Sequence, residues 1–118
     1  MKNEATGLKR IFSAYVFSMQ GLKACYQSEA AFRQEVWLSV ILIPLALYLR
    51  DEAVERVLLI TPIFLVLIVE VLNSAIESVV DRIGDEYHLL SGVAKDMGSA
   101  AVWLALMLLV AIWLIILI

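Results

Sequence analysis

Residues 97–118 form an unbroken apolar stretch without a charged side chain, and this stretch restricts the possible folds more than any other part of the chain. A helix of about 20 apolar residues is long enough to cross the hydrocarbon core of a bilayer. Hydrophobic residues make up 63% of the 118-residue chain, whereas about 45–50% is typical of a globular domain. A soluble domain of this size has too little interior to bury so much apolar surface. We therefore expect residues 1–118 to form a single all-α membrane domain.

Two further segments, residues 30–49 and 54–80, are also expected to span the membrane, although polar side chains interrupt both of them. Residues 5–27 form an amphipathic pattern in which apolar side chains recur at three- and four-residue steps. Lys9, Arg10 and Lys23 lie on the polar side of that pattern. A helix of this kind tends to lie in the membrane interface. The sequence therefore predicts three transmembrane helices preceded by a surface helix.

Basic residues predict the orientation of these helices. Lys2, Lys9, Arg10, Lys23 and Arg33 all precede or begin the first span, and such an excess of positive charge favours the cytoplasmic side. We therefore expect a cytoplasmic N-terminus, an external turn at 50–56, an internal loop at 82–96 and an external C-terminus. The net charge of −3 gives no broad basic surface that would indicate nucleic-acid binding.

The second span carries a stripe of polar residues. Relative to Glu70, a helix of about 100° per residue places Asn73 about 60° to one side, Glu77 about 20° to the same side and Asp81 about 20° to the other. Glu70 lies roughly 20 Å along the helix from Val57, and Glu77 roughly 30 Å. Glu70 is therefore submerged, while Glu77 reaches the cytoplasmic interface. Burying a charge at that depth costs at least about 2–3 kcal/mol, so such residues indicate function.

Several readings of this stripe remain open. A single amide such as Asn73 can simply join helices by hydrogen bonds, and a submerged carboxylate such as Glu70 can serve a proton or ion relay. A third reading is chemistry at the cytoplasmic boundary, where Glu29 and the charged residues of 82–96 lie at the same level. Carboxylates there could hold Mg²⁺, a hard cation that often bridges protein to phosphates. The chain lacks the GxxxxGK[ST] phosphate loop and the protein-kinase signature set.

Two segments carry a family resemblance. Residues 70–102 read EVLNSAIESVVDRIGDEYHLLSGVAKDMGSAAV, and residues 29–35 read EAAFRQE. The E-x-x-N-x-x-x-E core followed by AKD, together with the spacing of the two segments, closely resembles the bacterial integral-membrane diacylglycerol kinase family, which also includes undecaprenol kinases. The resemblance covers essentially the whole chain.

The resemblance implies a homotrimer in the bacterial inner membrane that transfers the γ-phosphate of MgATP to diacylglycerol. In that analogy Glu70 is the general base, Asn73 orients the reacting groups, and Glu29 and Glu77 hold Mg²⁺. The other positions that match the family's nucleotide site are Arg10, Phe17, Glu86, Tyr87, His88, Lys95 and Asp96. The positions that match the lipid site, besides Glu70, are Ala14, Met19, Lys23, Glu35, Arg56 and Ser99. Phe17 departs from the family, where a tyrosine is familiar, so its ring can stack on adenine but offers no hydroxyl.

Three other functions compete with this one. A kinase for a polyprenyl alcohol such as undecaprenol is the nearest alternative, because related family members use that lipid. A proton- or cation-coupled transporter would explain a submerged Glu70 but not its accompaniment by Glu29, Lys95 and Asp96. A purely structural membrane subunit would have no use for the polar stripe. Trp103 and Trp113 are interpreted as packing or interface anchors.

Overall fold

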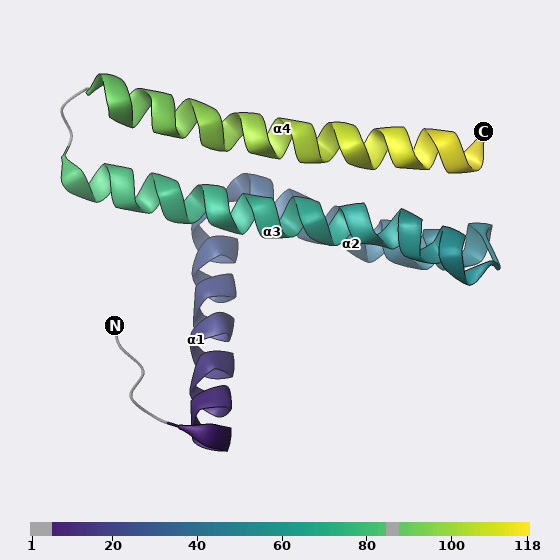
Figure 1. Cartoon of the computed structure of the whole chain (residues 1–118), viewed down its shortest axis with the longest axis horizontal. Helices are drawn as coiled ribbons and strands as arrows, with labels where there is room; N and C mark the ends of the chain where they lie inside the picture. Colours follow the sequence, from purple (N-terminus) through teal and green to yellow (C-terminus); the bar gives the residue numbers. More distant parts are fainter. Residues whose placement is uncertain (1–5, 85–87) are drawn as a thin grey trace.

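The computed structural model describes residues 6–84 and 88–118, which form four helices (Figure 1). The helices are α1 (Gly7–Ser28), α2 (Ala30–Leu49), α3 (Ala53–Ile83) and α4 (Leu89–Leu117). The described residues contain no strand. Three of the helices, α2, α3 and α4, are long and apolar enough to cross a membrane. These features confirm the predicted all-α membrane fold with three spans.

The helix α3 is the centre of the arrangement. It packs against α4 along its length and against α2 over the part nearer the connection at residues 50–52, whereas α1 leaves the other helices at a steep angle (Figure 1). Many large apolar side chains of the spans face outward, among them Trp37, which is 60% exposed, and Trp103, which is 65% exposed. Outward apolar side chains are what a helix needs when its solvent is lipid.

The second and third spans are longer helices than the sequence predicted. We expected them at 54–80 and 97–118, with a polar loop at 82–96, but α3 continues to Ile83 and α4 begins at Leu89. Lys95 and Asp96 therefore lie on α4 and not in a loop. Hydropathy reports which residues suit the hydrocarbon core, whereas helical hydrogen bonding continues into the interface. His88 supports the early start of α4, because its Nδ1 accepts a hydrogen bond from the Leu90 amide at 3.1 Å.

A small apolar core joins the three long helices. Ile63 and Val66 of α3 are buried against Ala105 and Leu109 of α4, and residues of α2 pack onto this cluster. At one end, where residues 50–52 connect α2 to α3, arginine side chains complete the contact. Arg56 donates hydrogen bonds to the carbonyls of Arg50 and Leu47, at 2.6 and 2.8 Å.

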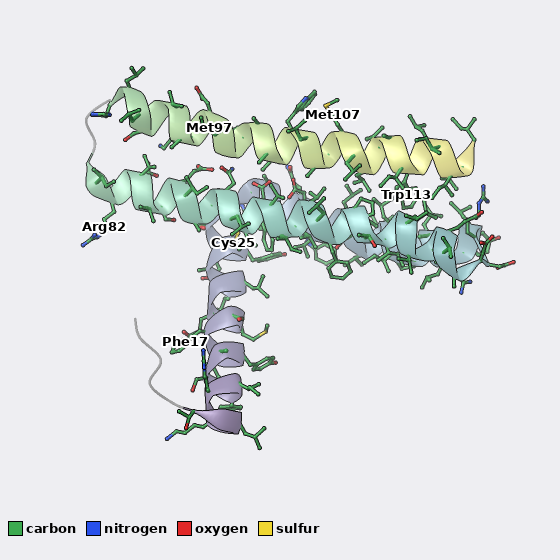
Figure 2. The ribbon with its side chains drawn as sticks, viewed as in Figure 1. Phe17, Cys25, Arg82, Met97, Met107 and Trp113 are labelled. Atoms are coloured by element: carbon green, nitrogen blue, oxygen red, sulfur yellow. The ribbon has the colours of Figure 1, made fainter. Side chains whose placement is uncertain are left out.

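A tryptophan also links α4 to α3. The indole Nε1 of Trp113 donates a 3.0 Å hydrogen bond to the carbonyl of Leu59 (Figure 2). Because lipid offers no alternative partner, we expect Trp113→Phe to destabilise the protein by about 0.6 kcal/mol and at most about 1.7 kcal/mol, the range for interhelical hydrogen bonds in membranes. Unfolding in mixed detergent micelles measures this loss. Trp103→Phe is the matched control, since Trp103 is exposed; equal losses for the two variants would contradict the assignment.

Candidate active site

The first part of the polar stripe of α3 faces the interior of the helix assembly, whereas Asp81 at its far end is exposed. Glu70 is 5% exposed, and Asn73 and Ser74 are each 8% exposed. Ordinary helical geometry places residues at steps of three and four on one face, so the stripe follows directly from the sequence spacing. A buried carboxylate within a membrane-spanning helix is costly, and such groups are characteristic of functional sites.

Two of the stripe's residues are hydrogen-bonded to each other. Nδ2 of Asn73 donates to Oε1 of Glu77 at 2.9 Å. The other amide atom, Oδ1 of Asn73, is buried without a hydrogen-bond partner in the described residues. Asp81, one turn beyond Glu77, lies 2.7 Å from Nζ of Lys95 on α4. The last turns of α3 are thus tied to the first turns of α4 by an ion pair.

A second carboxyl group accompanies Glu70. The side chain of Glu35 of α2 lies close to that of Glu70, and each keeps a buried Oε2 with no partner in the described part of the chain. The family analogy places Glu35 near the lipid, and the structure places it directly beside the expected base.

Glu29 completes a group of acidic side chains around α3. It lies at the junction of α1 and α2, and its amide donates a 2.9 Å hydrogen bond to the carbonyl of Cys25. Glu29 and Glu77 are both near enough to Glu70 for their charges to act on it. Within residues 6–84 and 88–118, no group of three or more side chains is arranged to hold a metal by protein ligands alone.

Neither Ser74 nor Cys25 was predicted from the sequence to lie at the site. Cys25 is buried, and its Sγ donates to Oγ of Ser74 at 3.6 Å. This contact attaches the end of α1, where Figure 2 labels Cys25, to α3 at a position four residues after Glu70. Ser74 is four residues from Glu70, and the same helical spacing that revealed Asn73 could have identified it.

The environment of Cys25 predicts that its thiol reacts slowly with alkylating reagents. Burial is the main factor that raises the pKa of Cys25, and the charges of Glu29, Glu70 and Glu35 raise it further, while the Ser74 hydroxyl opposes them. A raised pKa leaves less of the reactive thiolate at neutral pH. We therefore expect maleimide to label Cys25 in the folded protein more slowly than a cysteine placed at exposed Ser28 in a Cys25→Ala background. The labelling rate of Cys25 should still be rising at a pH where that of position 28 has levelled off; parallel pH profiles would contradict this.

The remaining predicted site residues are dispersed within one chain. Phe17 lies on the part of α1 that projects away from the spans (Figure 2), and Arg10 precedes it on the same helix. Arg56 lies 14 residues before Glu70 on α3, a separation of about 21 Å along the helix. Lys95, Asp96 and Ser99 are on α4, and His88 caps that helix. The expected nucleotide residues Glu86 and Tyr87 lie outside the described residues.

An apolar groove of about 530 Å³ lies where α1, α2 and α3 meet, and none of these carboxylates lines it. Leu22 and Tyr26 line it from α1, Phe32 and Val36 from α2, and Phe64 and Ile68 from α3. Lys23, an expected lipid-site residue, belongs to the same lining. Ala14 and Met19 are elsewhere on α1 and exposed. A surface of this composition suits a hydrocarbon chain with a polar end near Lys23.

Comparison with known proteins identifies the family. A family model described as prokaryotic diacylglycerol kinase matches residues 16–117. The diacylglycerol kinase of Escherichia coli (strain K12) is 54% identical over 117 residues, which cover 99% of this chain and 96% of that protein. Those of Pseudomonas aeruginosa and Haemophilus influenzae are 53% and 47% identical, over 92% and 93% of this chain and 88% and 93% of their own length. The chain belongs to the prokaryotic diacylglycerol kinase family.

Proposed function

We propose that the protein transfers the γ-phosphate of ATP to the free hydroxyl of diacylglycerol, forming phosphatidic acid at the cytoplasmic face of the inner membrane. The observation that carries this proposal is a buried carboxylate, Glu70, held within a membrane-spanning helix of a chain that belongs to the prokaryotic diacylglycerol kinase family. A lipid alcohol reaches such a group from the bilayer. The nucleotide arrives from water. Glu77 and Asp81 follow Glu70 along α3 toward the C-terminal end of that helix.

In the proposed reaction Glu70 accepts the proton of the lipid hydroxyl. The hydroxyl oxygen forms a bond to the γ-phosphorus while the bond from that phosphorus to the β,γ-bridging oxygen breaks, and ADP leaves. Phosphoryl transfer depends mainly on positioning and charge neutralisation. Asn73 lies one helical turn from Glu70 and is anchored to Glu77, so it is suited to orient the reacting groups.

The acidic residues fit the requirement for Mg²⁺. Mg²⁺ is usually held by one or two carboxylates together with substrate phosphates, and Glu29 and Glu77 provide two carboxylates of separate helical segments. Bound there, Mg²⁺ would neutralise charge on the ATP phosphates. The absence of a larger ligand group among the described residues agrees with a metal that is shared with the nucleotide.

The remaining nucleotide contacts are proposed for Arg10, Phe17, Glu86, Tyr87, His88, Lys95 and Asp96, and the lipid contacts for Ala14, Met19, Lys23, Glu35, Arg56 and Ser99. Residues on α1 such as Phe17 project away from α3 of the same chain. A homotrimer in which one protomer's α1 approaches its neighbour's spans would assemble these groups. We propose that arrangement, with a cytoplasmic N-terminus and α1 in the membrane interface.

A lipid-labelling assay tests the proposal. The purified protein in mixed micelles receives ATP with a labelled γ-phosphate, Mg²⁺ and either diacylglycerol or undecaprenol. We expect label in phosphatidic acid. Label only in polyprenyl phosphate would show that the substrate is the polyprenyl alcohol and not diacylglycerol. If no lipid is labelled, the kinase proposal is wrong, and a proton relay or transport role for the polar stripe would be favoured.

A further inference from the structure

Gly98 of α4 lies directly against Asn73 in the polar stripe of α3. It is buried in the interior of α4. A Cβ placed on Gly98 would overlap Oδ1 of Asn73 and would stand 3.1 Å from its Cγ. Gly98 does not have a positive φ, so its backbone does not require glycine. Because glycine is unfavourable inside a helix relative to alanine, space for Asn73 is the physical reason for it here.

This contact fixes the Asn73 amide from two sides. Nδ2 donates to Oε1 of Glu77, while Oδ1 lies against the α carbon of Gly98 at the point where a side chain would begin. Weak C–H···O contacts of this kind recur where helices approach closely. With Oδ1 held against α4, the donor end of the amide faces Glu77. A methyl group on Gly98 would push the amide aside or move α4 outward, and either change would break this arrangement.

We propose that Gly98 is a positioning residue for phosphoryl transfer, which acts by holding the Asn73 amide between α4 and Glu77. The inference rests on the proposed function for its catalytic consequence. Its structural part, that positions 98 and 73 are directly coupled, does not depend on the proposed function. Lys95 lies one helical turn before Gly98 on α4 and forms an ion pair with Asp81 of the stripe, so the same approach also brings that proposed nucleotide contact to the stripe.

The first test is Gly98→Ala in the full-length protein. We expect kcat to fall by about 10- to 100-fold, the size of effect that follows a misplacement of about 1 Å, with little change in the KM for diacylglycerol. Gly21→Ala is the matched control, because a Cβ at that helical position meets no atom within 4 Å, and its kcat should equal that of the wild type. Wild-type kcat for Gly98→Ala would overturn the inference.

A double-mutant cycle with Asn73→Ala separates positioning from a general loss of packing. Asn73→Ala removes the atom that the new methyl group would meet, so Gly98→Ala should lower kcat no further in that background, measured on the residual rate with excess protein. The thermal midpoint should follow the same rule, with a drop for Gly98→Ala alone and none in the Asn73→Ala background. Equal effects in both backgrounds would overturn the inference. Should Gly98→Ala alone fail to fold, recovery of folding in the double variant supports it, and failure of both variants contradicts it.

The double-mutant cycle measured by thermal midpoints can fail independently of the proposed function. A wild-type protein that labels no diacylglycerol would refute the kinase proposal, whereas the coupling of midpoints between positions 98 and 73 would still decide whether Gly98 holds Asn73. An active wild type without that coupling would leave the kinase proposal standing and remove Gly98 from it.

Discussion

Glu70→Gln is expected to lower kcat by about 10²- to 10⁴-fold, the contribution of a positioned general base. Glutamine has the shape of glutamate but cannot take the proton of the lipid hydroxyl at neutral pH. Its amide can also donate to Glu35, so the contact between α2 and α3 survives and buried negative charge is reduced. We therefore expect the variant to fold, to keep its thermal midpoint and to bind MgATP. Initial rates of phosphatidic acid formation and nucleotide binding measure these two properties.

Two companion variants make this result specific. Glu35→Gln likewise provides an amide that can donate across the interface, and it leaves the Glu70 carboxylate intact, so its loss in kcat should be clearly smaller than that of Glu70→Gln. Glu52→Gln makes the same chemical change at an exposed position at the start of α3, and its rate should equal that of the wild type. A folded Glu70→Gln protein with the wild-type rate, or a larger loss for Glu35→Gln, would refute the role of Glu70 as base.

Most of the fold could be predicted from local patterns in the sequence. The apolar stretches around 36–49, 57–69 and 97–118 require helices because lipid leaves backbone groups no other partner. Helical periodicity then places Glu70, Asn73 and Glu77 on one face, and the structure shows the Asn73–Glu77 hydrogen bond that this face allows. These features depend on residues that are near one another in the sequence, so no knowledge of tertiary packing was needed.

Three site contacts that sequence reasoning missed depend on the packing of one helix against another. The pairing of Glu35 with Glu70 joins α2 to α3, the Cys25–Ser74 contact joins α1 to α3, and the approach of Gly98 to Asn73 joins α4 to α3. Periodicity predicts which residues share one face of a helix. It does not predict how that helix is rotated, or shifted along its axis, relative to a neighbouring helix. Gly98 looked like an ordinary small residue in an apolar run, because only the position of Asn73 across the interface shows why a side chain cannot stand there.

The second large effect is expected at Glu77. Glu77→Gln should raise the Mg²⁺ concentration needed for half-maximal activity by at least about 10-fold, given that even residues that only support a metal ligand change metal affinity by about 10–100-fold. The loss in kcat/KM for ATP should be partly recovered at high Mg²⁺. Titration of the initial rate with Mg²⁺ at fixed ATP measures both effects.

The choice of glutamine separates the metal role of Glu77 from its contact with Asn73. The side-chain oxygen of glutamine can still accept the hydrogen bond from Nδ2 of Asn73, so this variant removes the negative charge and keeps the amide in place. Glu77→Ala removes both, and its additional loss over Glu77→Gln should appear in kcat and should not be recovered by Mg²⁺. A Glu77→Gln protein with an unchanged Mg²⁺ requirement would mean that Glu77 serves only to anchor Asn73, and the metal would then have to be held by Glu29 with other ligands.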